Sequence, residues 1–199
     1  IQRLNVDNRG ELLGEFKGDD LLLIVQQKGI LKTLKPDLNM HFPEDMIILE
    51  KWIIEKPISA IYFDGNKERY FIKRFLADNR KVEQQFIPSG SKIQLEMVSL
   101  DWKPVIETTF SKTSKVTRDN LTQNIEELIS IKGIKAQGNQ LSSHKIKNIN
   151  LLDPIPYTPP EKTPVMELEV NDEVDVQNEN LISEQDSTSN KEGQTELEF

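Results

Sequence analysis

The sequence predicts an all-β fold in which hairpin modules repeat in a propeller-like arrangement, followed by an acidic tail. The first observation is a recurrence of β-rich segments, whose turns fall near residues 29, 65, 102 and 138. A single hairpin cannot bury its own apolar face, so hairpins that repeat at a fixed period must pack on one another. The second is a division of charge: residues 1–153 contain 23 Lys and Arg against 21 Asp and Glu, whereas residues 154–199 contain 2 against 12. The third is a cluster of prolines, since five of the ten lie between Pro154 and Pro164.

Each β-rich segment is interpreted as two strands around a turn. In chain order the segments are LLLIVQQKGILKTLK with a turn at Lys28-Gly29, ISAIYFDGNKERYFIKRF with a turn at Gly65-Asn66, IQLEMVSLDWKPVIETTF with a turn near Trp102, and ISIKGIKAQGNQLSSHKIKNI with a turn at Gly138-Asn139. Asp64-Gly65 and Gly138-Asn139 are residue pairs that tolerate positive φ in tight hairpins.

One short stretch has helical spacing. Leu121, Ile125, Leu128 and Ile129 are spaced for one face of a helix, and Asp119 is placed to act as its N-cap. We expect this helix of about ten residues to be a connector inside a long loop.

The organisation predicted is a β domain over residues 1–153, which we expect to begin before Ile1, and a tail over residues 154–199. The prolines should form a stiff, extended exit from the fold. Residues 165–199 are too poor in apolar side chains to offset the entropy of ordering, and we expect them to be disordered.

Composition excludes several classes of site and location. The absence of cysteine excludes disulfides, thiolate metal sites and a nucleophilic cysteine. No apolar run reaches the roughly 18 residues that a membrane span needs, so no membrane partner is expected. We interpret the chain as a cytoplasmic, soluble part of a longer protein.

Charge within the β domain is unevenly distributed. Residues 67–81 and residues 112–147 each carry a net charge of +4, whereas residues 7–20 carry −3 and residues 37–55 carry −4. One interpretation is a cationic track for nucleic-acid phosphates, which Lys and Arg attract regardless of base sequence. The other is an ordinary solvated strand face, because a net charge of +2 over the domain is small for a nucleic-acid-binding protein.

Four segments resemble a known family: NVDNRGELLGEF, HFPEDMIILEKW, YFDGNKERYFIKRF and ISIKGIKAQGNQLSSHKIKNINLL. They are similar to the C-terminal domain of the A subunit of bacterial topoisomerase IV, in its Bacteroidetes-like form, over nearly all of residues 1–153. The resemblance implies a β-pinwheel, in which neighbouring blades exchange strands and a basic outer edge binds and bends duplex DNA. The parent enzyme is a type II topoisomerase that relaxes and decatenates DNA and needs ATP and Mg²⁺. The resemblance also implies association with the nucleoid and with the B subunit, through a part of the protein outside this sequence.

The resemblance assigns candidate DNA contacts. Lys132 and Lys135 lie in KGIKAQGN, which matches the turn-bearing blade motif of the family, and Lys145 and Lys147 follow it. Neighbouring strand residues point to opposite faces, so at most one of Lys73 and Arg74 is expected on the DNA edge. The loop residues Lys112, Lys115 and Arg118 could contact DNA or be solvated. The glycine-rich basic box of gyrase A subunits is missing, which favours topoisomerase IV over gyrase.

No catalytic residue, metal site or cofactor site is expected within this sequence. Arg69-Tyr70 resembles the Arg-Tyr pair at the cleavage centre of these enzymes, but Tyr70 lies in a strand pattern without the flanking residues of that centre. Gly133 and Gly138 are not followed by the Lys and Ser or Thr of a phosphate-binding loop. His41 with Glu44 and Asp45 is better explained as a solvated loop than as a metal site.

The last residues, GQTELEF, suggest a second partner. Gln194, Leu197 and Phe199 have the Q-x-x-L-x-F spacing of peptides that bind the bacterial sliding clamp, although Thr195 replaces the usual leucine. A random acidic terminus is the alternative. A further hypothesis is that the acidic tail competes with DNA for the basic edge. For the whole chain, a propeller-like protein-interaction module without DNA binding remains the alternative function.

Overall fold

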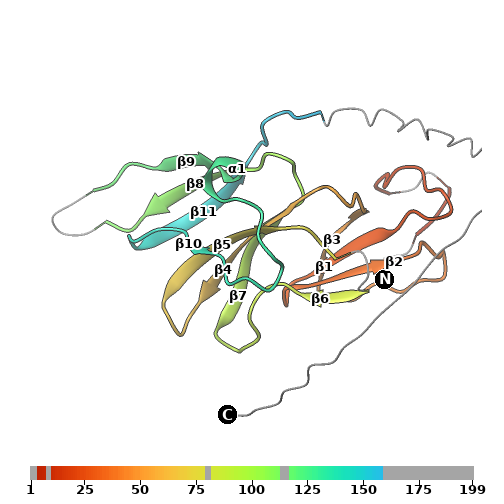
Figure 1. Ribbon diagram of the computed structural model, residues 1–199, viewed down its shortest axis with the longest axis horizontal. Helices are drawn as coiled ribbons and strands as arrows, with labels where there is room; N and C mark the ends of the chain where they lie inside the picture. The colour runs from red at the N-terminus through yellow and green to blue at the C-terminus, as the bar shows by residue number, and fades with distance from the viewer. Residues whose placement is uncertain (1–3, 8–9, 79–81, 113–116, 159–199) are drawn as a thin grey trace, which may run out of the picture. The chain divides into compact units, whose positions relative to one another are not determined.

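A computed structural model describes residues 4–7, 10–78, 82–112 and 117–158 of the chain (Figure 1). The chain divides into two units, Ile1–Pro159 and Pro160–Phe199, and the described residues all belong to the first. Of the tail predicted over residues 154–199, only residues 154–158 are described, and they contain no helix or strand. Within the described ranges, no helix has the length and apolar character that a membrane crossing requires.

The described part is nearly all β, as the sequence predicts, and its strands form three antiparallel sheets. Sheet A has the order β3 (Met46–Lys51), β1 (Leu22–Gln26), β2 (Ile30–Leu34) and β6 (Glu83–Gln85). Sheet B has the order β10 (Asn139–Gln140), β5 (Arg69–Phe75), β4 (Ile58–Asp64) and β7 (Ile93–Ser99). Sheet C has the order β11 (Ile146–Leu152), β8 (Val105–Phe110) and β9 (Leu121–Asn124).

The first two predicted hairpins are confirmed. Strands β1 and β2 pair around Gly29, with Gln26 opposite Ile30, and β4 and β5 pair around Gly65, with Asp64 opposite Arg69. The second turn is held by the Asp64 carboxylate, which accepts the backbone N–H groups of Asn66 and Lys67. Its positive φ, +52°, is at Glu68 and not at Gly65. Gly65 is required instead by a close approach, because a Cβ there would lie 2.9 Å from the Lys92 carbonyl oxygen.

The third and fourth predicted hairpins are wrong. The two strands around Trp102 do not pair with each other, because β7 joins β4 in sheet B while β8 joins β9 and β11 in sheet C. Residues 129–138 contain no strand, β10 pairs with β5, and β11 pairs with β8. The recurrence with turns near residues 29, 65, 102 and 138 therefore aligned strands that occupy different places in their sheets.

A different regularity connects the sheets. In sheets A and B a hairpin is flanked on one side by the next strand of its own sheet, β3 or β7. On the other side lies a short strand, β6 or β10, which the chain reaches only after forming the hairpin of the following sheet. Each of these two sheets is thus completed by a later part of the chain.

The predicted ten-residue helix is also wrong in extent. Residues 121–124 form β9, which pairs with β8, and the helix α1 is limited to Ile125–Leu128. Its N-cap is Asn124, whose side chain accepts the Glu126 N–H, and not Asp119. Ile125 and Ile129 are nevertheless buried, as the apolar spacing indicated.

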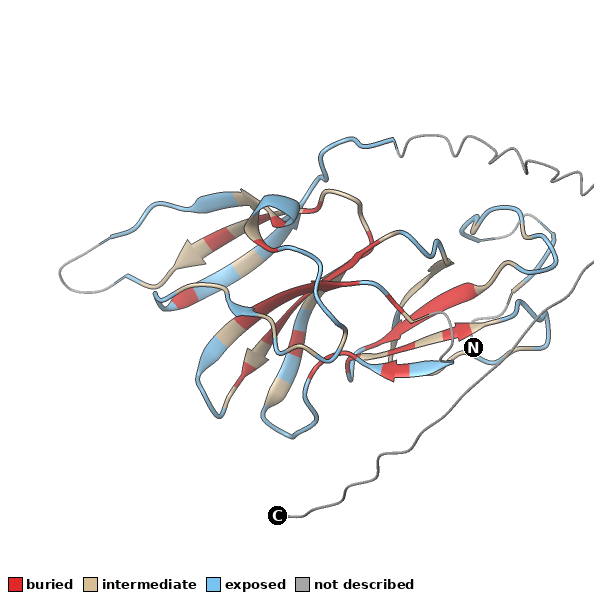
Figure 2. Cartoon of the chain, in the orientation of Figure 1, coloured by how far each residue is buried: buried red, intermediate tan, exposed pale blue. Residues whose placement is uncertain are grey.

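Two apolar clusters join the sheets (Figure 2). The first lies between sheets A and B and includes Leu23, Val25, Tyr62 and Phe75. The second joins sheets B and C and includes Ile61, Ile72, Ile106 and Ile125. Side chains alternate across a strand, so sheet B buries both of its faces along most of its central strands β4 and β5.

Candidate nucleic-acid interface

The loop that carries the KGIKAQGN motif crosses one edge of sheet B. The Lys132 N–H donates to the Arg74 carbonyl at 2.9 Å, and the Leu141 N–H donates to the Tyr70 carbonyl at 2.9 Å. These two hydrogen bonds fix the loop at both ends of β5. Between them, the Tyr62 hydroxyl donates to the Gln137 carbonyl at 2.8 Å. The loop is therefore held through its backbone, which leaves its exposed side chains free to face outward.

Lys73 supplies the main attachment of this loop and is not a surface residue. Its side chain is 3% exposed, and Nζ donates to the carbonyl oxygens of Phe86, Ile134 and Ala136 at 2.5, 2.7 and 2.7 Å. All three protons of the ammonium group thus have acceptors. The prediction that Lys73 lies on a DNA edge is corrected, because a phosphate cannot reach this nitrogen.

Arg74 is buried as well, on the opposite face of β5. Its side chain is 5% exposed, and Nη2 donates to the Trp102 carbonyl at 2.8 Å, which ties sheet B to the segment between β7 and β8. Burial lowers the pKa of Arg74, and the Glu126 carboxylate partly offsets this effect. Because β5 is covered on both faces, neither Lys73 nor Arg74 is available to DNA.

The buried amine gives a prediction about pH. Burial lowers the pKa of Lys73 to about 8, whereas a lysine in an unfolded chain titrates near pH ~10.4. Between these values the unfolded chain binds more protons than the folded chain, so the free energy of unfolding should rise with pH, by up to about 3 kcal/mol. Below this window both states are protonated and the contribution is constant. Urea denaturation from about pH 7.5 to pH 10.5 should show the rise in the wild type relative to Lys73→Met, and parallel curves would contradict it.

Gly138 gives a prediction about the close contact between the loop and β5. Its φ is +90°, and a Cβ at this position would lie 2.3 Å from the Ile72 carbonyl oxygen. Gly138→Ala should lower the free energy of unfolding by about 2 kcal/mol, because it combines backbone strain with a clash against main-chain atoms. Gly133→Ala is the matched control in the same loop, since no atom lies within 4 Å of its added Cβ. Equal thermal unfolding of the two variants would contradict this account.

Lys132 and Lys135 are both exposed on the outer side of the loop. The Lys132 ammonium donates to the Asn139 side-chain oxygen at 2.8 Å. The residues on either side of Lys135, Ile134 and Ala136, turn their carbonyls inward to Lys73. In this segment the backbone carbonyls therefore attach the loop to the core through Lys73, whereas the side chains of Lys132 and Lys135 are exposed to solvent.

A second group of cations lies at one end of sheet C. Strand β8 ends there while β9 and β11 begin there, and the Ser111 N–H donates to the Lys145 carbonyl at 2.9 Å. We name this group the sheet C cationic end; it consists of Lys112, Arg118, Lys145 and Lys147, all exposed. Asp119 in the same loop reduces its net charge. Lys115 lies outside the described residues.

The turn between β4 and β5 carries further cations that the sequence did not single out as contacts. Lys67, Arg69 and Lys92 are exposed at this end of sheet B, and the Gly65 N–H donates to the Lys92 carbonyl at 2.8 Å. Arg69, the first residue of β5, donates to the side-chain oxygen of Gln140 in β10 at 2.6 Å, which links this end of β5 to β10. The charge run at residues 67–81 indicated Lys67 and Arg69, but only the fold places Lys92 beside them.

The remaining candidates from the sequence are Tyr70, the possible metal site around His41 and the C-terminal motif. Tyr70 packs against Phe63 at a ring distance of 4.9 Å and contacts the second apolar cluster, and burial raises its pKa. In the described ranges, no three His, Asp or Glu side chains are grouped to hold a metal ion. Gln194, Leu197 and Phe199 lie outside the described residues.

Comparison with protein families agrees with this architecture. The sequence profile of the family described as "Topoisomerase C-terminal domain, Bacteroidota" matches residues 3–153. The chain belongs to this family. A search of curated proteins finds no match. The match covers all three sheets, so the β domain of the chain is a bacterial topoisomerase C-terminal domain. Within the matched region Lys73 and Arg74 are buried, whereas Lys132, Lys135, Lys145 and Lys147 are exposed.

Proposed function

We propose that this topoisomerase C-terminal domain is a DNA-binding and DNA-bending accessory domain of the A subunit of topoisomerase IV. The observation that carries the proposal is the match to the topoisomerase family over residues 3–153. The domain contributes binding to the enzyme, while strand cleavage, ATP hydrolysis and Mg²⁺ binding belong to other parts of it, including the B subunit.

The order of strands supports a β-pinwheel. Strands β6 and β10 each complete a sheet that began before the intervening hairpin, and strand exchange between the neighbouring blades of a pinwheel would give this order. On this arrangement the exposed cations of successive sheets can follow one curved edge. Bending a short duplex over such an edge costs on the order of 1–6 kcal/mol, which several phosphate contacts can offset.

Two clusters of cations support contact with phosphates. Lys132 and Lys135 project from the loop over sheet B, and the sheet C cationic end follows within the same stretch of chain. Lys and Arg bind phosphates without reading base sequence. We therefore expect affinity for duplex DNA of any sequence and a preference for curved or crossed duplexes.

Salt dependence tests the proposal against the alternative of a protein-interaction module. Binding through about five phosphates should make log K fall by roughly 4 to 5 for each tenfold rise in salt concentration. Titration of the whole chain with a linear and a prebent duplex at two salt concentrations should show this slope and tighter binding to the bent duplex. Absence of binding at low salt, or equal affinity for both duplexes, would contradict DNA binding and DNA bending respectively.

The sliding clamp is proposed as a second partner, through Gln194, Leu197 and Phe199. Its support is the spacing of one polar and two apolar residues in GQTELEF. Clamp capture by the whole chain should be lost when Phe199 is removed, and equal capture by both forms would contradict it.

A further inference from the structure

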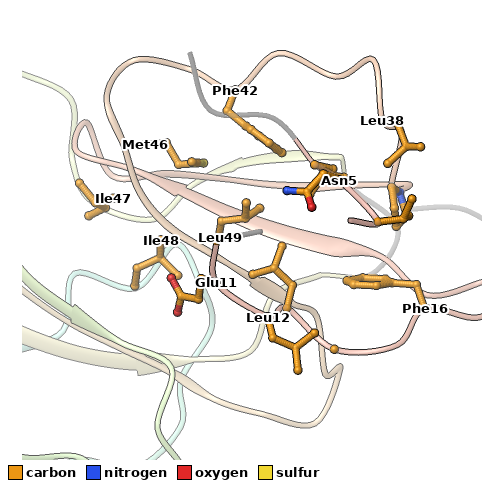
Figure 3. A pocket seen from close by; sticks show the side chains of 16 residues that line it. Asn5, Glu11, Leu12, Phe16, Leu38, Phe42, Met46, Ile47, Ile48 and Leu49 are labelled. Atoms are coloured by element: carbon orange, nitrogen blue, oxygen red, sulfur yellow. The ribbon is translucent and has the colours of Figure 1, made fainter. Parts of the chain in front are cut away.

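The face of sheet A that is turned away from sheet B is only partly covered. Leu23 and Val25 of β1 pack toward sheet B in the first apolar cluster. Ile24 lies between them on the opposite face, and its partner in β3 is Leu49. Over this opposite face, residues 4–6, 10–16 and 36–42 form an open groove of about 970 Å³ (Figure 3).

The groove is lined mainly by apolar side chains, several of which are in contact with solvent. Its lining includes Leu4, Leu12, Phe16, Phe42, Met46 and Leu49. Leu12 is 87% exposed, and Leu38, on the opposite rim, is 52% exposed. Strand β1 itself is buried, with Ile24 at 0% exposed, so the exposed apolar surface belongs to β3, where Ile47 is 43% exposed, and to the segments over the sheet. Clustered apolar exposure of this kind is typical of a surface that another molecule covers.

The segments around the groove are strongly acidic. Residues 7–20 carry a net charge of −3 and residues 37–55 carry −4. Two cations of this region are paired with its carboxylates: Lys51 with Asp20 at 2.6 Å, and Lys28 with Asp45 at 3.5 Å. An acidic rim repels nucleic-acid phosphates and attracts cationic side chains. The groove is therefore electrostatically unlike the sheet C cationic end.

We propose that this groove docks a segment of a partner protein that carries at least two large apolar side chains flanked by Lys or Arg. The apolar side chains fill the groove, which supplies most of the affinity, and the cations face the acidic rim, which supplies selectivity. This interaction goes beyond DNA binding, since it uses another sheet and the opposite charge. It would stand even if the domain bound no DNA.

The test measures binding of a fluorescein-labelled synthetic peptide to the whole chain by anisotropy. The probe alternates lysine with leucine or phenylalanine over seven residues. One control peptide replaces the apolar residues by serine, and a second replaces lysine by glutamate. The serine peptide keeps its lysines, so its affinity measures the contribution of charge alone, including any binding to the acidic tail. We expect the probe to bind at least tenfold more tightly than either control peptide.

Matched variants locate the site. Leu12→Ser should weaken binding of the probe at least fivefold, whereas Val82→Ser, at an exposed valine outside the groove lining, should leave it unchanged. Glu11→Gln, on the groove, should weaken binding about twofold and reduce its salt dependence, and Glu96→Gln, on β7, should not. These positions are exposed or at the rim, and thermal unfolding monitored by circular dichroism checks that each variant is folded.

Three results would overturn the proposal. Equal binding of the serine peptide would mean that charge alone is responsible. Equal effects of Leu12→Ser and Val82→Ser would place the peptide elsewhere. Concentration-dependent self-association that Leu12→Ser abolishes, measured by sedimentation, would show that a second copy of this chain covers the groove.

Discussion

Replacing Lys73 by methionine should lower the free energy of unfolding by about 3 kcal/mol, one of the two largest effects that we expect. Methionine matches the volume of the lysine stem but donates no hydrogen bond. The carbonyl oxygens of Phe86, Ile134 and Ala136 would each lose a donor, the first in a buried and the other two in partly buried positions, and an unsatisfied buried acceptor costs on the order of 1–3 kcal/mol. Part of this cost is offset because the buried charge is removed as well. Chemical denaturation at pH 7 measures the difference.

The control for this variant is Lys135→Met, which changes an exposed lysine in the same loop. It should alter the free energy of unfolding by no more than about 0.5 kcal/mol, as is usual for surface substitutions. If Lys73→Met proved as stable as the wild type, the ammonium group would contribute no net attachment of the loop to sheet B.

Neutralising three lysines at the sheet C cationic end should weaken binding to duplex DNA by roughly 100-fold at low salt. The variant replaces Lys112, Lys145 and Lys147 by glutamine. Each lost phosphate contact removes about 0.9 from the slope of log K against log salt, so the slope should fall by about 2.7. Fluorescence anisotropy with a labelled duplex at several salt concentrations measures both quantities.

The charge-matched control replaces Lys17, Lys28 and Lys35, three exposed lysines of the acidic region around sheet A. Both triple variants change the net charge by the same amount, so a general loss of positive charge would affect them alike. Equal weakening of DNA binding would assign the interaction to net charge and remove the sheet C cationic end as a site. A separate Lys132→Gln and Lys135→Gln double variant measures the contribution of the loop.

The sequence predicts local pairing in this fold better than long-range pairing. The β1–β2 and β4–β5 hairpins were predictable because a short turn joins two strands that pair with each other. The connection at Trp102 has the same local features, but the Trp102 carbonyl accepts from Arg74, and the strands on either side separate into sheets B and C. That separation depends on partners distant in sequence, which no local turn pattern contains.

The same limit affected the site residues. Alternation along FIKRF limits the DNA edge to at most one of Lys73 and Arg74, but it does not show whether either face of the strand is open to solvent. Strand β5 lies between β10 and β4 and is enclosed on both faces, so both cations are buried. The lysines outside strand interiors, such as Lys135 and Lys145, were placed correctly at the surface because no packing partner competes for them.

Completion of sheets A and B by a later strand has a consequence for synthesis of the chain. Strand β5 ends at Phe75, but β10, which pairs with its edge, begins at Asn139. While the ribosome translates the intervening residues, the nascent chain presents the β5 edge with its hydrogen-bonding groups unpaired. Such an edge invites pairing with other chains. A polypeptide released before Asn139 should therefore aggregate during expression, even though it contains both complete hairpins.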